Sequence, residues 1–308
     1  LMGLGAFDED SPLSVHMLGM HGSAYANWAM RDADCIIAVG ARFDDRITGL
    51  TSAFAPNARQ AEREGRGGFI HFDVAPEQIN KVIPVTIPVE GDAKKNLELL
   101  LPLLKKQDRT EWINQLAEWK TKHPFRYKAD DREFHLKPQA VIEEFCRQTD
   151  GNAIVSTGVG QHQMWAAQFW QFRKPNQWVT SGGLGTMGFG VPASLGAKLA
   201  KPDMQVLNFD GDGSFSMTAM EMVTAAQYNI NAKSIILNND FQGMVKQWQD
   251  LFYAKRYSAV DLKETNPDFV KLAEAFGAVG IRVFRDEDVK MRSPRRWLLM
   301  IVLCSWIL

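Results

Sequence analysis

The segment 206–239, VLNFDGDGSFSMTAMEMVTAAQYNINAKSIILNN, constrains the fold of this chain more than any other. Its first apolar run, 206–209, ends at Asp-Gly-Asp-Gly, as a buried parallel strand does at the carboxyl edge of a sheet. Residues 218–228 predict a helix, and a second apolar run, 234–237, ends at Asn-Asn. The segment therefore predicts a strand–helix–strand unit with a right-handed crossover, whose two turns open at the same sheet edge.

Oxygen-bearing side chains follow both predicted strands. Asp212 lies in the first turn and Asn239 in the second, at the edge where open α/β sheets bind ligands. Mg²⁺ prefers oxygen ligands and usually takes one or two protein groups, while phosphate oxygens and water fill its other positions. Gly211 and Gly213 allow backbone N–H groups to approach an anion. The turns thus predict a magnesium–phosphate site; the alternative is two solvated turns with capping residues.

Length and composition limit the classes of protein to consider. A chain of 308 residues, 45% of them hydrophobic, predicts about two domains with a substantial core. The net charge is −1, from 35 basic and 36 acidic residues, which gives no electrostatic reason to expect nucleic acid or a membrane as partner. The three cysteines, Cys35, Cys146 and Cys304, are far apart, which predicts reduced core residues without a disulfide or zinc site.

The two ends of the sequence are unusual. It begins with Leu1 and not with Met, and no targeting peptide can be read at its start, so we expect the chain to begin inside a longer gene. At the other end a basic cluster precedes a mostly apolar run, 297–308. That run is too short to span a bilayer.

Three apolar runs in the first third, 35–39, 69–72 and 85–89, predict strands that alternate with helices in a parallel sheet. Their carboxyl ends would present Arg42, Asp73 and Asp92. A strand-end carboxylate can accept hydrogen bonds from ribose, and an arginine can hold a diphosphate. The alternative is strand-end turns with local ion pairs. Ahead of this sheet, the glycine-rich turn 17–27 leads into a helix. Its glycines are explained either by close approach of the backbone to a flat ring system or by plain turn geometry.

The second half continues the same alternation. Residues 108–137 predict a helix and an interdomain linker, and because acidic residues balance the basic ones, their aromatic side chains do not indicate nucleic acid. A helix over 138–148 and a strand over 153–156 follow. The strand ends before Gln161 and His162, which would lie within reach of phosphate oxygens at the carboxyl edge or else act as helix-capping residues.

A glycine loop satisfies GxGxxG with Gly183, Gly185 and Gly188, between a strand at 178–181 and a helix at 191–200. A dinucleotide site must therefore be considered, with Asp210 as the residue that would bind ribose. Against it, Asp210 lies within the Asp-Gly-Asp-Gly turn, and one loop does not easily serve both a ribose and a metal diphosphate. The motif alone is a weak signal.

The remaining elements are a helix after the turn 242–243, a helix over 267–276 and a strand over 278–284. In the first of these helices Met244, Val245 and Trp248 share one face. A stripe at this spacing usually packs into a core.

Seven sequence motifs occur together along residues 1–290: LMGLGAF, MLGMHGSAYAN, GARFDDR, TGVGQHQMW, TSGGLGTMGFG, GDGSFSMTAME, and LNND with GMVKQWQ. In this combination the sequence resembles the catalytic subunits of acetolactate synthase (acetohydroxyacid synthase), which use thiamine diphosphate (ThDP). GMHG, GARFDDR and GMVKQWQ separate that family from other ThDP enzymes, and EGRGGFIHFD with NPDFVKLAEA is similar to fungal members. The resemblance implies an α/β fold of two doubly wound parallel-sheet domains: an FAD-type middle domain over 1–107, a linker over 108–136, and a ThDP domain over 137–308.

The resemblance also implies roles for individual residues in the ThDP domain. Mg²⁺ would be held by Asp212, Asn239 and the main-chain carbonyl of Phe241. The residues expected around ThDP are Gln161, His162, Gly185, Met187, Gly213 and Ser214. The substrate pocket would be formed by Met244, Val245 and Trp248.

In the first domain the resemblance implies a structural FAD. The residues expected to bind it are Leu1, Met2, Met20, His21, Arg42, Asp44, Arg46, Asp73 and Asp92. The expected reaction is decarboxylation of pyruvate and condensation with a second 2-keto acid, pyruvate or 2-ketobutyrate, in branched-chain amino-acid biosynthesis. Expected partners are further copies of the chain in a homodimer or tetramer and a regulatory small subunit. The expected location is mitochondrial for a fungal protein and cytoplasmic otherwise.

The sequence departs from the family at both ends. The family's N-terminal domain carries the activating glutamate, and we expect no counterpart of it in these residues. No catalytic residue is therefore assigned, and we expect the 308 residues to be inactive alone. From about residue 291 the sequence no longer follows the family. The alternative function is a non-catalytic module of the same fold that binds cofactor or associates with other subunits.

Overall fold

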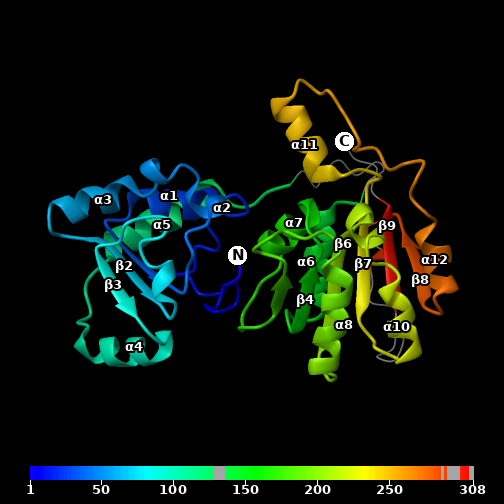
Figure 1. The fold of residues 1–308 in the computed structure, drawn as a ribbon, viewed down its shortest axis with the longest axis horizontal. Helices are drawn as coiled ribbons and strands as arrows, with labels where there is room; N and C mark the ends of the chain where they lie inside the picture. Colours follow the sequence, from blue (N-terminus) through cyan, green and yellow to red (C-terminus); the bar gives the residue numbers. More distant parts are fainter. Residues whose placement is uncertain (128–135, 286–287, 290–298, 305–308) are drawn as a thin grey trace. The chain divides into compact units, whose positions relative to one another are not determined.

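The computed structural model describes residues 1–127, 136–285, 288–289 and 299–304, the last range by its backbone alone. The chain forms two compact units (Figure 1). One is Val15–Phe125, and the other combines Leu1–Ser14 with Arg126–Leu308. The first fourteen residues thus group with the C-terminal unit, whereas the division at 107 and 137 remains a prediction. The sequence was expected to depart from the family from about residue 291, and residues 291–298 lie outside the described part.

The unit Val15–Phe125 is built on the parallel sheet that the three apolar runs predict. Its strands are β1 (Cys35–Val39), β2 (Gly68–Asp73) and β3 (Ile87–Glu90), in that order. Its α-helices are α1 (Ala24–Asp32), α2 (Asp45–Thr48), α3 (Pro56–Arg63), α4 (Ala93–Leu100) and α5 (Thr110–Lys122). Strand β3 begins two residues later than predicted, because the backbone N–H of Val85 donates instead to Asn80 Oδ1 at 2.8 Å.

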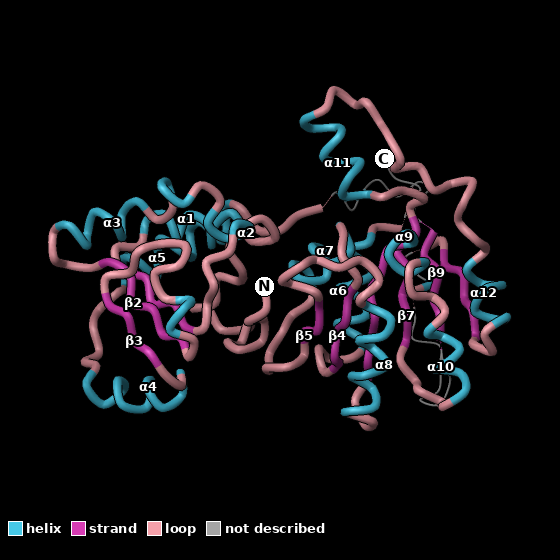
Figure 2. Tube along the Cα trace, in the orientation of Figure 1, coloured by secondary structure: helices cyan, strands magenta, loops and turns pink. Residues whose placement is uncertain are grey.

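The other unit contains a six-stranded parallel sheet in the order β5-β4-β6-β7-β9-β8. Its strands are β4 (Ala153–Thr157), β5 (Trp178–Thr180), β6 (Gln205–Gly211), β7 (Lys233–Asn238), β8 (Val279–Val283) and β9 (Leu299–Cys304). Its helices are α6 (Pro138–Gln148), α7 (Gln161–Phe169), α8 (Gly190–Ala200), α9 (Asp212–Ser216), α10 (Glu221–Gln227), α11 (Gly243–Phe252) and α12 (Phe269–Ala275). Figure 2 shows the strands of this sheet flanked by helices.

Two hydrophobic layers enclose the sheet of this unit. On one face, Val191 of α8, Met222 of α10 and Phe269 of α12 pack with Ile236 of β7. On the other face, Phe145 of α6 packs edge-on against Phe209 of β6, at 5.9 Å between ring centroids. Because neighbouring residues of a strand point to opposite faces, β6 and β7 are buried on both sides, which explains their continuous apolar runs. The doubly wound prediction is confirmed for this unit.

Several expectations from the sequence differ from the structure. Strand β6 runs through Asp210 and Gly211, two residues past its predicted end, because both still pair with β7. The helix predicted over 218–228 is shorter and begins at Glu221; Thr218 lies in a turn, where its hydroxyl donates to Gly188 O at 2.7 Å. Cys35 is exposed, so its assignment to the core was wrong, whereas Cys146 is buried; both are free thiols.

The strand order reverses beside β4. From β4 the chain passes through α7 to β5 on one side, and then returns through α8 to β6 on the other. Open α/β sheets bind ligands at such a point, outside the carboxyl ends of the strands. Within the described residues, no helix combines the length and the apolar character that a membrane crossing requires.

Candidate functional site

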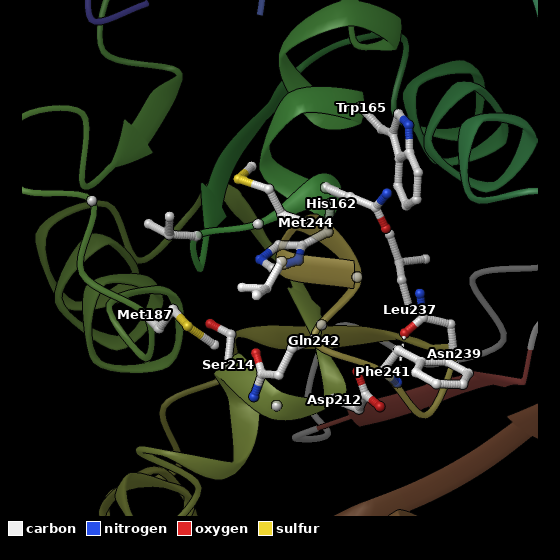
Figure 3. A pocket seen from close by; sticks show the side chains of 18 residues that line it. His162, Trp165, Met187, Asp212, Ser214, Leu237, Asn239, Phe241, Gln242 and Met244 are labelled. Carbon is white, nitrogen blue, oxygen red and sulfur yellow. Dashed lines mark hydrogen bonds between the residues drawn. The ribbon is translucent and has the colours of Figure 1, made fainter. Parts of the chain in front are cut away.

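A cavity of about 170 Å³ lies at the carboxyl ends of β4, β6 and β7 (Figure 3). Eleven of the twelve residues that the sequence assigned to this unit's site line it: Gln161, His162, Gly185, Met187, Asp212, Gly213, Ser214, Asn239, Phe241, Met244 and Val245. They come from four separate segments, which only the sheet brings together. The cavity also contains Trp165, Gln242 and Gly243, which the sequence did not single out.

Oxygen donors gather at one end of the cavity, where Figure 3 places Asp212, Asn239 and Phe241. Asp212 is 2% exposed, and burial raises its pKa to about 6, with a further increase from Asp240 and an opposing hydrogen bond from Asn266. Asn239 Oδ1 accepts from the Phe241 N–H at 3.1 Å, which folds the turn after β7. One carboxylate, one carboxamide and one carbonyl provide a small set of hard oxygen donors, which fits Mg²⁺.

No cluster of three or more His, Cys, Asp or Glu side chains that could hold a metal occurs among the residues that the structure describes. Sites for Zn²⁺ and most other transition metals rely on such clusters. The oxygen group at Asp212 contains one acidic side chain, so it suits a cation that keeps other ligands from phosphate or water.

Small residues shape the phosphate side of the cavity. A Cβ on Gly213 would lie 2.6 Å from Gln242 Nε2, so a side chain here would require Gln242 to move. Ser214 is buried, and its hydroxyl accepts from the Gly188 N–H at 3.0 Å. This bond ties the glycine loop before α8 to the turn after β6. Gly185, in the same loop, has a φ of +69°, a conformation that glycine adopts without strain.

A buried polar network lies beneath the cavity floor. Asp210 is fully buried and accepts from the Gly211 N–H at 3.1 Å and from Asn208 Nδ2 at 3.3 Å. His162 Nε2 lies 3.4 Å from Asp210 Oδ1 without forming a hydrogen bond to any described residue. Burial lowers the pKa of His162 to about 3 and raises that of Asp210 to about 7. His162 is therefore a neutral imidazole at physiological pH.

The burial of Asp210 contradicts the dinucleotide interpretation. A ribose-binding carboxylate must reach the ligand, but Asp210 has no exposed surface and its oxygens serve the polar network. The glycine loop also forms internal hydrogen bonds, because Gly188 bonds through both its N–H and its carbonyl to the segment after β6. GxGxxG in this sequence is thus a motif of close packing between two loops.

Helix α11 does not contribute the core stripe that its spacing suggests. The structure describes all ten residues of α11, and among them only Lys246 is buried. Met244 and Val245 line the cavity, but Trp248 does not. Trp248 is 44% exposed and its ring lies 5.0 Å from that of Phe252. The core interpretation was therefore wrong for α11, which presents apolar side chains to the cavity and to solvent.

Sequence reasoning missed Asn266, which lies in the loop before α12. Its side-chain nitrogen donates to Asp212 Oδ2 at 2.8 Å, although 54 residues separate the two in sequence. No local signal marks such a residue, because it acts through a tertiary contact. For Gln242 and Gly243 a local signal did exist, since both directly follow the turn that contains Asn239.

The candidate residues of Val15–Phe125 have local partners. Asp73 Oδ1 accepts from the Ala75 N–H at 2.9 Å, and Asp92 caps α4 by accepting from the Lys95 N–H at 2.9 Å. Arg42 forms an ion pair with Asp44 at 3.3 Å. These contacts are those of strand-end turns and ion pairs.

Other candidate residues of this group are placed differently. Met20 is exposed and His21 is buried. A cavity of about 250 Å³ in Val15–Phe125 is lined by other residues, among them Leu18, Met30 and Phe54. Leu1 and Met2 belong to the C-terminal unit, where a Cβ on Gly182 would lie 2.3 Å from Met2 Sδ.

Comparison with protein families assigns both parts of the chain. Residues 158–293 match the model described as thiamine pyrophosphate enzyme, C-terminal TPP binding domain, and residues 1–100 match thiamine pyrophosphate enzyme, central domain. The chain belongs to the thiamine pyrophosphate enzyme family. The matched C-terminal domain of this family includes all the cavity-lining segments, and thiamine pyrophosphate is the same compound as ThDP.

Curated relatives place the chain more narrowly within the thiamine pyrophosphate enzymes. It is 52% identical to the mitochondrial acetolactate synthase catalytic subunit of Saccharomyces cerevisiae, over 94% of this chain and 42% of that protein. It is 52% identical to the mitochondrial acetolactate synthase of Schizosaccharomyces pombe, over 94% and 44%. Identity to the acetolactate synthase isozyme 3 large subunit of Escherichia coli is 43%, over 95% and 50%. The chain spans about half the length of these relatives, and the expected resemblance to acetolactate synthase catalytic subunits is confirmed.

Proposed function

We propose that the cavity at the carboxyl ends of β4, β6 and β7 binds the diphosphate of ThDP through Mg²⁺. The observation that carries this proposal is the convergence of eleven sequence-predicted residues on one cavity. In this arrangement Asp212, Asn239 and the carbonyl of Phe241 hold the cation. The diphosphate is bound by Gln161, His162, Gly213 and Ser214. A neutral His162 donates one hydrogen bond to a phosphate oxygen and adds no charge.

The other cavity residues orient the cofactor. Met187 provides an apolar support for the bend between its two rings, and Gly185 leaves space beside it. When bound, ThDP supplies a thiazolium carbon that attacks a keto group and accepts the electron pair released with CO₂. Met244 and Val245 border the same cavity and would contact a 2-keto acid. Trp248 would contribute to substrate selection only if α11 changes its position.

By the names of the relatives, we propose that the whole protein is an acetolactate synthase. It would decarboxylate pyruvate and join the product to pyruvate or 2-ketobutyrate. Relatives named catalytic or large subunits imply a regulatory subunit, and the fungal relatives named mitochondrial suggest that compartment for this protein. An FAD bound by Val15–Phe125, through Met20, His21, Arg42, Asp73 and Asp92, is part of the same proposal.

Calorimetry of the 308-residue chain tests the cofactor site. ThDP should bind in the presence of Mg²⁺ and not in EDTA, and Asp212→Ala should abolish binding because it removes the only carboxylate among the expected ligands. Asp203→Ala is the charge-matched control, since Asp203 is exposed and lines a different cavity. Binding that survives Asp212→Ala, or ThDP binding in EDTA, would contradict the proposed metal site. No binding to the unaltered chain would favour a module without a cofactor.

A further inference from the structure

The Asn266 side chain connects the two turns that contain the expected metal ligands. Its Nδ2 lies 2.8 Å from Asp212 Oδ2, 2.9 Å from Asp240 Oδ1 and 3.3 Å from Asn238 Oδ1. Asp212 follows β6, whereas Asn238 ends β7 and Asp240 lies in the turn after it. One carboxamide thus contacts both turns, from a loop that contributes no residue to the cavity lining.

The segment 260–266 fixes this carboxamide in place. Its backbone pairs with the turn after β7, through Gln242 N–H to Val260 O at 2.8 Å and Leu262 N–H to Asp240 O at 2.8 Å. The Asn266 N–H in turn donates to Leu262 O at 2.8 Å. Asn266 is therefore held by backbone bonds to the same turn that carries Asn239, so its side chain is preorganised.

The hydrogen-bond capacity of Asn266 is matched to this position. A carboxamide nitrogen has two hydrogens and no capacity to accept, so it can serve two carboxylates at once and cannot compete with them for a cation. Its two shortest contacts are to the carboxylates of Asp212 and Asp240. Asn266 bonds only the Oδ2 atom of Asp212, so its bond does not occupy Oδ1.

We propose that Asn266 is a positioning residue for the divalent-cation site. Its side chain orients the Asp212 carboxylate, and it holds the Asp240 carboxylate in a hydrogen bond so that Asp240 does not become a competing ligand. This inference rests on the proposed Mg²⁺–ThDP site. Residues that orient a metal ligand in this way commonly change metal affinity about 10-fold to 100-fold when they are removed.

The test separates cation binding from cofactor binding in the 308-residue chain. Mn²⁺ reports the divalent site, through the loss of its free-ion electron paramagnetic resonance signal in the presence of ThDP. Calorimetry at saturating Mg²⁺ reports ThDP affinity. For Asn266→Ala we expect the Kd of Mn²⁺ to rise by about 10-fold or more, while the Kd of ThDP at saturating Mg²⁺ changes by less than about twofold, because Asn266 does not line the cavity.

Two further variants control this measurement. Asn266→Asp keeps the shape of the side chain but removes both hydrogens and adds a third carboxylate, so it should weaken Mn²⁺ binding at least as much as Asn266→Ala. Thr265→Ala changes the same loop and removes only an exposed bond to Leu262 O, at 3.1 Å. It should leave both affinities within about twofold of the unaltered chain, given the small net value of one exposed hydrogen bond.

Each other outcome has a defined meaning. Unchanged Mn²⁺ affinity in Asn266→Ala overturns the inference and leaves the proposed function intact. Tighter Mn²⁺ binding by Asn266→Asp also overturns it, since position 266 would then act as a ligand. An equal loss of Mn²⁺ affinity in Asn266→Ala and Thr265→Ala would also overturn it, because the effect would then come from disturbance of the loop and not from the Asn266 side chain. An unaltered chain that binds no Mn²⁺ with ThDP would refute the proposed function itself, together with the inference.

Discussion

Replacing Gly158 by alanine tests whether the cavity floor depends on close packing around Asp210. A Cβ at this position would lie 2.0 Å from Asp210 Oδ1 and 2.1 Å from Ser214 Oγ. Ordinary contact would require both oxygens to withdraw by more than about 1 Å. Gly158 is not among the residues with positive φ, so alanine meets no backbone strain and the whole effect comes from these contacts.

The size of the effect follows from what Asp210 would lose. Displacing its carboxylate breaks the bonds from the Gly211 N–H and from Asn208 Nδ2 in a fully buried site. A buried polar group left without a partner costs about 1–3 kcal/mol, and overpacking costs a similar amount. We expect Gly158→Ala to lower the free energy of unfolding of its unit by about 3–5 kcal/mol. ThDP affinity should fall as well, because Ser214 moves.

Urea unfolding followed by circular dichroism, with calorimetry of ThDP and Mg²⁺, measures both effects. Gly196→Ala is the matched control: Gly196 lies in α8, and an added Cβ there meets no atom within 4 Å. That substitution should leave ThDP affinity unchanged and stabilise the unit by about 0.5–1 kcal/mol. If Gly158→Ala unfolds within about 1 kcal/mol of the unaltered chain and still binds ThDP, the packing argument for Asp210 is wrong.

Three further substitutions give two independent predictions. Burial raises the pKa of Glu9 from 4.5 to about 7, so the folded state favours the protonated carboxyl. The contribution of Glu9 to the free energy of unfolding is therefore greatest below pH 4.5 and is lost as the pH rises to about 7. Glu9→Gln should therefore stabilise its unit at pH 8 by about 1–2 kcal/mol, after allowance for solvent screening, and not at pH 4.5; an equal gain in urea unfolding at both pH values would contradict the assignment. Trp248→Ala should leave ThDP affinity within about twofold of the unaltered chain, whereas Met187→Ala should weaken it, because of these two residues only Met187 lines the cavity. If calorimetry shows a larger loss for Trp248→Ala than for Met187→Ala, the placement of Trp248 outside the cavity is wrong.

The elements near the candidate site were predictable because each has a strong local signal. The apolar runs of β6 and β7 are buried on both sheet faces and end at Gly and Asn. Their type could therefore be found, and their carboxyl ends to within two residues. The parallel pairing of these strands then follows from the crossover rule, and it brings Asp212 and Asn239 to one edge. Cavity residues in the turns after β4, β6 and β7 were therefore identified from the sequence.

Features that depend on tertiary contacts were not predictable in this way. Asp210 resembles a turn residue in the sequence, but it continues β6 because Asn208 and the Gly211 N–H satisfy its buried carboxylate. The stripe on α11 has the spacing of a core helix, yet the helix extends the cavity wall and leaves Trp248 half-exposed. Asn266 has no sequence signal, since its role depends on a backbone pairing between distant turns.

The arrangement around the cavity also explains why so many of its residues are glycine or have short polar side chains. Three loops meet at the carboxyl edge, and each is tied to a neighbour by a side-chain bond to backbone or carboxylate: Ser214 to Gly188, Thr218 to Gly188, and Asn266 to Asp212. Such bonds need close backbone approach, which larger residues at Gly158 or Gly190 would prevent. The cavity is consequently formed by the chain itself, and a ligand that enters it does not have to supply the free energy of ordering these loops.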